Sequence, residues 1–229
     1  MWSSRAASAA TYTVEDSELR LTIPAAQGHW CEGDHQPPLR VSGIQSGIRS
    51  GPVGSTSGQQ PFREGQSVRE AQPEQWGWTP GYGTLQVRAR MELGPSSMAS
   101  VWLVGLEDAP DRCGEICLFE VFGDALVDGN AAVGMGVKPI RDPQLTGDFE
   151  APRLELDVAE HHVYAARWEP GRVEFSVDGE PTRTVEQAPA YPVQAMGALF
   201  DFPEKGVPER PPLFAIDWIR GPASAGEAA

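Results

Sequence analysis

The sequence predicts an all-β fold in which two antiparallel sheets pack face to face as a β-sandwich. Apolar and polar residues alternate along many short segments, which is the pattern of half-buried antiparallel strands. The 25 glycines and 21 prolines supply turns between such strands. We find no convincing amphipathic helix and no internal repeat. The 229 residues suffice for one large sandwich with a sizeable core, so we expect a single domain over residues 1–229.

The expected strands follow one another from residue 12 almost to the end of the chain. Residues 12–23 place Leu19, Leu21 and Ile23 between polar neighbours and predict one or two strands. The Asp178-Gly179 pair predicts a hairpin turn that joins two short strands. The other expected strands are 39–50, 84–92, 98–106, 115–122, 131–139, 161–168, 173–177, 182–185, 191–200 and 213–220.

Three segments have the composition of loops. Residues 51–75 are rich in Gly, Ser, Gln and Glu and hold few large apolar side chains, so they predict a surface insertion, with a disordered excursion as the alternative. Residues 141–160 are acidic and rich in turn residues. Residues 221–229 are expected to form a loose tail.

Composition and charge exclude several classes of partner. The net charge is −14, from 32 acidic and 18 basic residues, so nucleic acid and anionic membrane surfaces are not expected partners. No stretch approaches the 18 apolar residues of a membrane span. The N-terminus lacks the apolar segment of a signal peptide, so the chain as it stands is expected to be cytoplasmic, or secreted if its N-terminus has been trimmed.

The three cysteines are Cys31, Cys113 and Cys117, and an odd number leaves at least one outside any intramolecular pair. A Cys31–Cys113 disulfide is conceivable, but reduced thiols are the simpler interpretation. His29, Cys31 and His35 are metal-ligand residue types within one loop. Their spacing fits no standard zinc pattern, so we expect no metal site.

The segment Gly114–Gly123, GEICLFEVFG, predicts a strand that carries two glutamates. In a flat strand Glu115 and Cys117 share one face, whereas Glu120 points to the apolar face. A β-bulge near Leu118–Phe119 would turn Glu120 to the face of Glu115. Two carboxylates on one face are typical of a retaining glycosidase, which uses one as nucleophile and the other as acid/base, about 5–5.5 Å apart.

This strand resembles the bulged signature E-x-D-x-x-E of glycoside hydrolase family 16, which includes laminarinases and licheninases. The resemblance implies a concanavalin A-like jelly roll, with Glu115 as nucleophile, Glu120 as acid/base, no cofactor and a polysaccharide or oligosaccharide as partner. Cys117 stands where the family has its middle Asp. Five further pieces similar to family segments occur in the family's order: Tyr82–Arg90, Ala99–Leu103, His162–Trp168, Val177–Gly179 and Asp217–Arg220.

The resemblance and the residue types also give candidate substrate contacts. Exposed indoles offer flat apolar faces on which sugar rings stack, whereas buried ones would belong to the core. Gln45 lies near a basic position of the family, and an exposed polar strand residue is the alternative. The insertion 51–75 falls between two cleft-forming strands and is expected to build one wall of the groove. The candidates are Trp76, Trp78, Trp102, Gln45, Arg88 and Phe119.

The predicted function is an endo-acting glycosidase that hydrolyses a polysaccharide of the β-glucan or galactan type by double displacement. Cys117, as a weak S–H donor, cannot orient Glu115 as an Asp would, so we expect a reduced turnover. The family often has a cleft histidine within residues 131–139, where Lys138 is the nearest polar group. A thiol nucleophile is disfavoured because the adjacent glutamates would raise its pKa. A catalytically impaired carbohydrate-binding protein and a structural sandwich are the alternatives.

Overall fold

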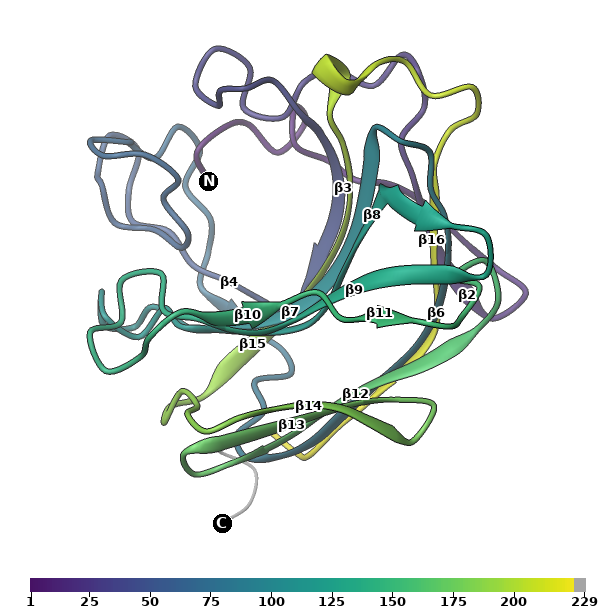
Figure 1. Ribbon diagram of the computed structural model, residues 1–229. Helices are drawn as coiled ribbons and strands as arrows, with labels where there is room; N and C mark the ends of the chain where they lie inside the picture. Colours follow the sequence, from purple (N-terminus) through teal and green to yellow (C-terminus); the bar gives the residue numbers. More distant parts are fainter. Residues whose placement is uncertain (225–229) are drawn as a thin grey trace.

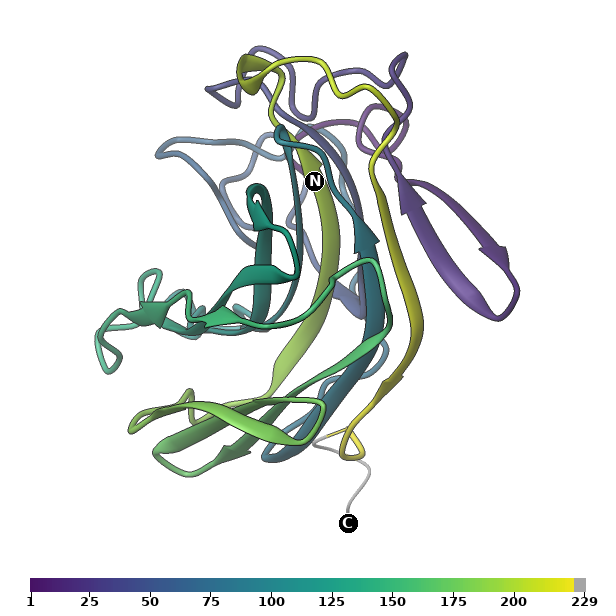
Figure 2. The same ribbon diagram turned by 45° about the vertical axis from the view of Figure 1, so that its right-hand side comes forward.

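The computed structural model describes residues 1–224, which form two antiparallel sheets packed as a sandwich (Figures 1 and 2). The first, here the β6 sheet, contains in spatial order β1 (Thr11–Glu15), β2 (Glu18–Thr22), β16 (Leu213–Arg220), β6 (Gly83–Glu92), β12 (His162–Glu169), β13 (Arg172–Val177) and β14 (Glu180–Val185). The second, the β8 sheet, contains β10 (Asp148–Glu150), β9 (Asn130–Lys138), β8 (Glu115–Val127), β7 (Ser97–Gly105), β15 (Val193–Asp201) and β3 (Arg40–Gln45), and β11 (Arg153–Leu154) also pairs with β9. The remaining elements are the pair β4 (Gly47–Ile48) and β5 (Gln75–Trp76) and a 3₁₀ turn, η1 (Pro203–Lys205).

The core lies between the two sheets and follows the alternation of the sequence. Along β6 every second residue is buried, from Leu85 to Met91, while the residues between them are only partly buried. Strand β6 pairs with β16 on one side and β12 on the other. Its buried residues belong to one core cluster with Ile116 and Leu118 of β8. The sandwich predicted from the sequence is therefore the observed fold.

The strands of both sheets bend in the same direction (Figure 2), which leaves the outer face of the β8 sheet concave. Loops from the N-terminal third of the chain cover part of this face (Figure 1). They hold a small apolar cluster of their own, in which Trp2, Cys31 and Val68 are buried and Trp30 and Phe62 pack against them. Trp2 Nε1 donates to the carbonyl of Gln59 at 2.8 Å, so the N-terminus fixes the insertion 51–75.

The first four residues of the expected tail, 221–224, are not loose, because two hydrogen bonds hold them. Trp78 Nε1 donates to the carbonyl of Pro222 at 2.7 Å, and the backbone N–H of Thr79 donates to Ser224 Oγ at 3.2 Å. The rest of the expected tail, residues 225–229, lies outside the described residues. Within 1–224, no helix has the length and apolar character to cross a membrane.

Candidate active site

Strand β8 carries the expected bulge. Cys117 and Glu120 are three residues apart, yet their register partners on β9, Gly136 and Gly134, are only two residues apart. The extra residue falls at Leu118–Phe119, and the register with β7 shifts at the same place. A bulge of this kind reverses the side on which the following side chains project. It therefore brings Glu120 to the face of Glu115.

Burial along β8 agrees with this geometry. Ile116, Leu118 and Phe119 are at most 1% exposed and belong to the core, whereas Glu115 and Glu120 are partly exposed. Cys117 is buried, with its Sγ 4.0 Å from Ser100 Oγ. The structure thus brings the three candidate catalytic residues to the concave face.

Two candidate substrate contacts were wrong. Phe119 is fully buried, with its ring 4.3 Å from that of Tyr164 and 5.8 Å from that of Phe214, because the bulge turns it into the core. Arg88 is paired with Asp217 on the outer face of the β6 sheet, since its neighbours in β6 face the core. Neither side chain can touch a sugar on the concave face.

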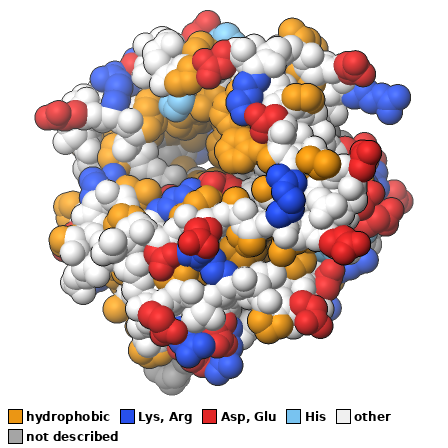
Figure 3. Space-filling model, viewed as in Figure 1, with side chains coloured by type: hydrophobic (Ala, Val, Ile, Leu, Met, Phe, Trp, Pro, Cys, Tyr) orange, Lys and Arg blue, Asp and Glu red, His pale blue; other side chains and the backbone are white. Residues whose placement is uncertain are grey.

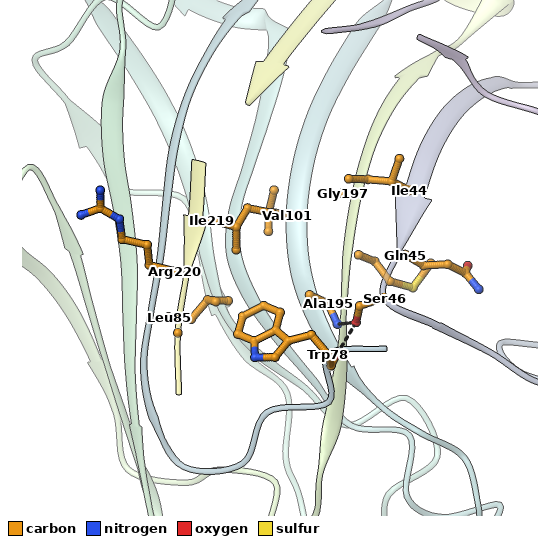
Figure 4. A pocket seen from close by; sticks show the side chains of 12 residues that line it. Ile44, Gln45, Ser46, Trp78, Leu85, Val101, Ala195, Gly197, Ile219 and Arg220 are labelled. Atoms are coloured by element: carbon orange, nitrogen blue, oxygen red, sulfur yellow. Dashed lines mark hydrogen bonds between the residues drawn. The ribbon is translucent and has the colours of Figure 1, made fainter. Parts of the chain in front are cut away.

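The two tryptophans of residues 76–78 are separated. Trp78 does not line the cavity that contains Glu115. It lines a second cavity, of about 530 Å³, which lies beside core residues of both sheets such as Leu85 and Val101 (Figure 4). Its carbonyl accepts a hydrogen bond from Ser46 Oγ at 2.6 Å. Trp78 as a substrate contact is therefore also wrong. Trp76 packs over Gly47 on β4 and does not line the cavity beside Glu115.

Trp102 and Gln45 do lie beside the catalytic strand, in a cavity of about 540 Å³ on the concave face. Trp102 pairs in register with Cys117 on one side and with Met196 of β15 on the other, and Met196 pairs with Gln45 of β3. The cavity reaches Glu115 at one end. Figure 3 shows a hollow on this side of the molecule that is bordered by hydrophobic side chains.

The insertion 51–75 forms one wall of this cavity. The backbone N–H of Gln60 donates to Glu107 Oε1 at 2.6 Å, and its side-chain amide contacts Met196 Sδ at 2.8 Å. Gln59 Nε2 donates to the carbonyl of Leu106 at 3.3 Å. The insertion therefore reaches Met196 on β15 and the residues that follow β7.

Several residues of the concave face were missed by the sequence analysis. Gln194, on β15, is 1% exposed and lines the cavity, and its Oε1 has no hydrogen-bond partner. A row of aromatic rings leads away from Trp102, with successive centroid distances of 6.3, 6.5 and 6.1 Å. Its members are Trp102, Phe200, Phe202 and Phe122. Their strands are recognisable in the sequence, but their convergence depends on strand order.

The two glutamates have different electrostatic surroundings. Burial raises the pKa of Glu115 to about 7; the Lys138 ammonium opposes this shift, and the carboxylates of Glu120 and Glu107 add to it. Glu120 Oε1 instead accepts a hydrogen bond from Lys138 Nζ at 2.6 Å. Lys138 is thus a neighbour of both carboxyl groups.

The thiol of Cys117 is held neutral. Burial, followed by the Glu120 carboxylate, raises its pKa far above the ordinary value. All three cysteines are buried and free. A thiolate is the reactive form of cysteine, so this environment disfavours Cys117 as a nucleophile. Within residues 1–224, no three His, Cys, Asp or Glu side chains gather in a metal-binding arrangement.

Comparison with known proteins identifies the family of the chain. The family model described as "Glycosyl hydrolases family 16" matches residues 78–220. A comparison with curated protein sequences finds no match.

Solved structures of similar fold come from several bacteria. A GlcNAcα1-4Gal-releasing endo-β-galactosidase from Clostridium perfringens superposes with a TM-score of 0.75 at 23% identity, over 93% of this chain and 53% of that one. This chain thus spans about half the length of that protein. A structure from work on endo-acting O-glycanases of the human gut microbiota gives 0.60 at 18% identity, over 93% and 82% of the two chains. The laminarinase catalytic domain of Thermotoga maritima gives 0.55 at 17% identity, over 92% and 79%.

Proposed function

The chain belongs to glycosyl hydrolase family 16, and on this premise we propose that it is an endo-acting glycosidase that cleaves a β-glucan or galactan with retention of configuration. The observation that carries the proposal is the bulge in β8, which brings Glu120 to the face of Glu115, and Glu115 lines the cavity on the concave side. A retaining mechanism needs two neighbouring carboxyl groups with different protonation states.

In the proposed first step, ionised Glu115 attacks the anomeric carbon while Glu120 gives its proton to the leaving oxygen. In the second step, Glu120 removes a proton from water, and the water displaces Glu115 from the glycosyl-enzyme. Trp102 and the aromatic row beyond it supply apolar faces for sugar rings. Because the fold is similar to that of an endo-β-galactosidase and a laminarinase, we include both galactans and β-glucans among the substrates to test.

A catalytically impaired carbohydrate-binding protein is the second candidate, and two observations favour it. Cys117 supplies no carboxylate beside Glu115, and Lys138 holds Glu120 in an ion pair at 2.6 Å. The first leaves Glu115 without an orienting partner, and the second opposes the protonated Glu120 that the first step needs.

The test is reducing-end release from β-1,3-glucan, mixed-linkage β-glucan, xyloglucan and galactan. We expect cleavage of at least one, with loss of at least about 10³-fold in kcat for Glu115→Gln and for Glu120→Gln. Glu180→Gln, on an exposed residue of β14, is the matched control and should keep full activity. Binding without release by the wild type would establish the second candidate instead.

Azide separates the roles of the two glutamates. With an activated aryl glycoside, Glu120→Ala should still form the glycosyl-enzyme, and azide should then accelerate turnover and give a β-glycosyl azide. The same treatment of Glu115→Ala should give no β-product, because the covalent intermediate cannot form. Full activity of Glu115→Gln would contradict the mechanism.

A further inference from the structure

Lys138 lies at the end of β9, beside the two glutamates. In the register of β8 and β9 its Cα is paired with Glu115, but its ammonium reaches along β8 to Glu120 Oε1. Gly136 and Gly134 stand opposite Cys117 and Glu120 in the same register. The Lys138 ammonium interacts electrostatically with all three catalytic candidates.

The ammonium also rests on an aromatic ring. Lys138 Nζ lies 4.4 Å from the ring centroid of Phe149, on β10. A Cβ at Gly134 would lie 2.5 Å from this ring and 3.2 Å from Glu120 Cβ, so the glycine is needed for the close approach. The cation–π contact and the ion pair together fix the position of the charge.

Other cations nearby are already engaged. Arg141 is paired with Glu107, and Arg183 with Asp148. Lys138 is thus the counter-ion that Glu115 and Glu120 share. The titratable groups around the site are Glu115, Cys117 and Glu120 on β8, Lys138 on β9, Glu107 after β7, Arg141 after β9, Asp148 on β10 and Arg183 on β14.

We propose that Lys138 is a positioning residue that, from the neighbouring strand, orients Glu120 and acts as the counter-ion of the catalytic pair. The ion pair fixes Glu120 in place and leaves Glu115 as the carboxyl of the pair with the raised pKa. With a neutral Cys117 between the glutamates, the Lys138 ammonium is balanced by the Glu120 carboxylate alone while Glu115 keeps its proton.

The kinetic consequence rests on the proposed function. The first step needs one proton on the pair, which Glu120 passes to the leaving oxygen, so activity should fall as pH rises past the titration at about 7 that removes this proton. Lys138 lowers the pKa of Glu115 against the effect of burial. Without the ammonium, the pair should hold this proton to a higher pH.

The first test needs no substrate. The full chain is labelled with [δ-¹³C]glutamate, the Glu115 signal is assigned by its absence in Glu115→Gln, and its titration is followed by NMR. We expect a midpoint near 7 in the wild type, a rise of about 1 unit or more in Lys138→Met and Lys138→Gln, and a return towards the wild-type value in Lys138→Arg.

The matched control is Lys205→Met, because Lys205 also pairs with a carboxylate, that of Asp124, and lies over the rings of Phe122 and Phe202. This variant should leave the Glu115 titration unchanged. The inference is overturned if the two neutral Lys138 variants titrate as the wild type does, or if Lys138→Arg does not restore the midpoint.

The second test is the pH profile of kcat/KM on any polysaccharide that the wild type cleaves. The alkaline limb should move to higher pH in Lys138→Met and return in Lys138→Arg. An equal loss at every pH would mean a merely structural lysine and would overturn the inference. If the wild type cleaves nothing, the proposed function fails, but the NMR titration still decides the role of Lys138.

Discussion

The ring of Phe119 lies 4.3 Å from the ring of Tyr164, centroid to centroid, between the two sheets. Both side chains are fully buried. Phe119 is the residue that follows the extra position of the bulge in β8, and Tyr164 belongs to β12 of the opposite sheet. This contact fixes the bulge in one direction, because Phe119 can fill the core only if Glu120 faces the cleft.

Truncation of Phe119 should therefore cost both stability and site geometry. We expect Phe119→Ala to lower the free energy of unfolding by about 3–5 kcal/mol, measured by urea denaturation. Phe122→Ala, three residues further along β8 at a partly exposed position, is the control and should cost clearly less. Equal losses in the two variants would contradict the anchoring role of Phe119.

Restoring the family carboxylate at position 117 should not harm catalysis. We expect Cys117→Asp to turn over at least as fast as the wild type at pH 8, because a carboxylate can orient Glu115 whereas the neutral thiol cannot. Cys117→Asn has nearly the same shape without the charge, so it should not share the gain. The measurement is kcat on the best polysaccharide, and a loss of turnover in Cys117→Asp would show that the site has adapted to the thiol.

Glu115 should make stability depend on pH. Its carboxyl titrates at about 7 in the folded chain against an ordinary value of 4.5. Between these values only the unfolded state loses the proton, so the free energy of unfolding falls as pH rises and then levels above 7.

Glu115→Gln removes this titration. It should be more stable than the wild type by roughly 1–3 kcal/mol at pH 8, with the difference vanishing towards pH 4. Urea unfolding at both pH values measures the effect, with Glu180→Gln as control. A constant difference between pH 4 and pH 8 would mean that the carboxyl titrates alike in both states.

Gln194 should recognise a sugar hydroxyl. Its side chain is 1% exposed, lines the cleft and leaves Oε1 without a partner. An unsatisfied buried amide costs stability until a ligand pairs with it. We expect Gln194→Leu to be more stable by about 1 kcal/mol and to raise KM about tenfold. Trp102→Ala should also raise KM, but without the gain in stability. An unchanged KM in Gln194→Leu would remove the amide from the binding site.

Local patterns in the sequence determined the sandwich, the position of most strands and the bulge. Alternation is enough to define a half-buried strand. Within Gly114–Gly123, a flat strand would point Glu120 to the apolar face, and this conflict predicts the bulge. The short strands β10 and β11 were missed, because two or three residues in an acidic, turn-rich segment carry too little periodicity to predict.

Only the tertiary structure decided which side chains share the cleft. The sequence placed Phe119, Arg88 and Trp78 at the substrate, but these lie in the core, on the outer face of the β6 sheet and beside core residues of both sheets, respectively. Gln194 enters the cleft instead, from β15, which is distant from β8 in sequence, and Lys138 reaches Glu120 from the adjacent strand β9. The physical reason is that the pleat fixes the face of a residue within its own strand, whereas strand order and register fix its neighbours.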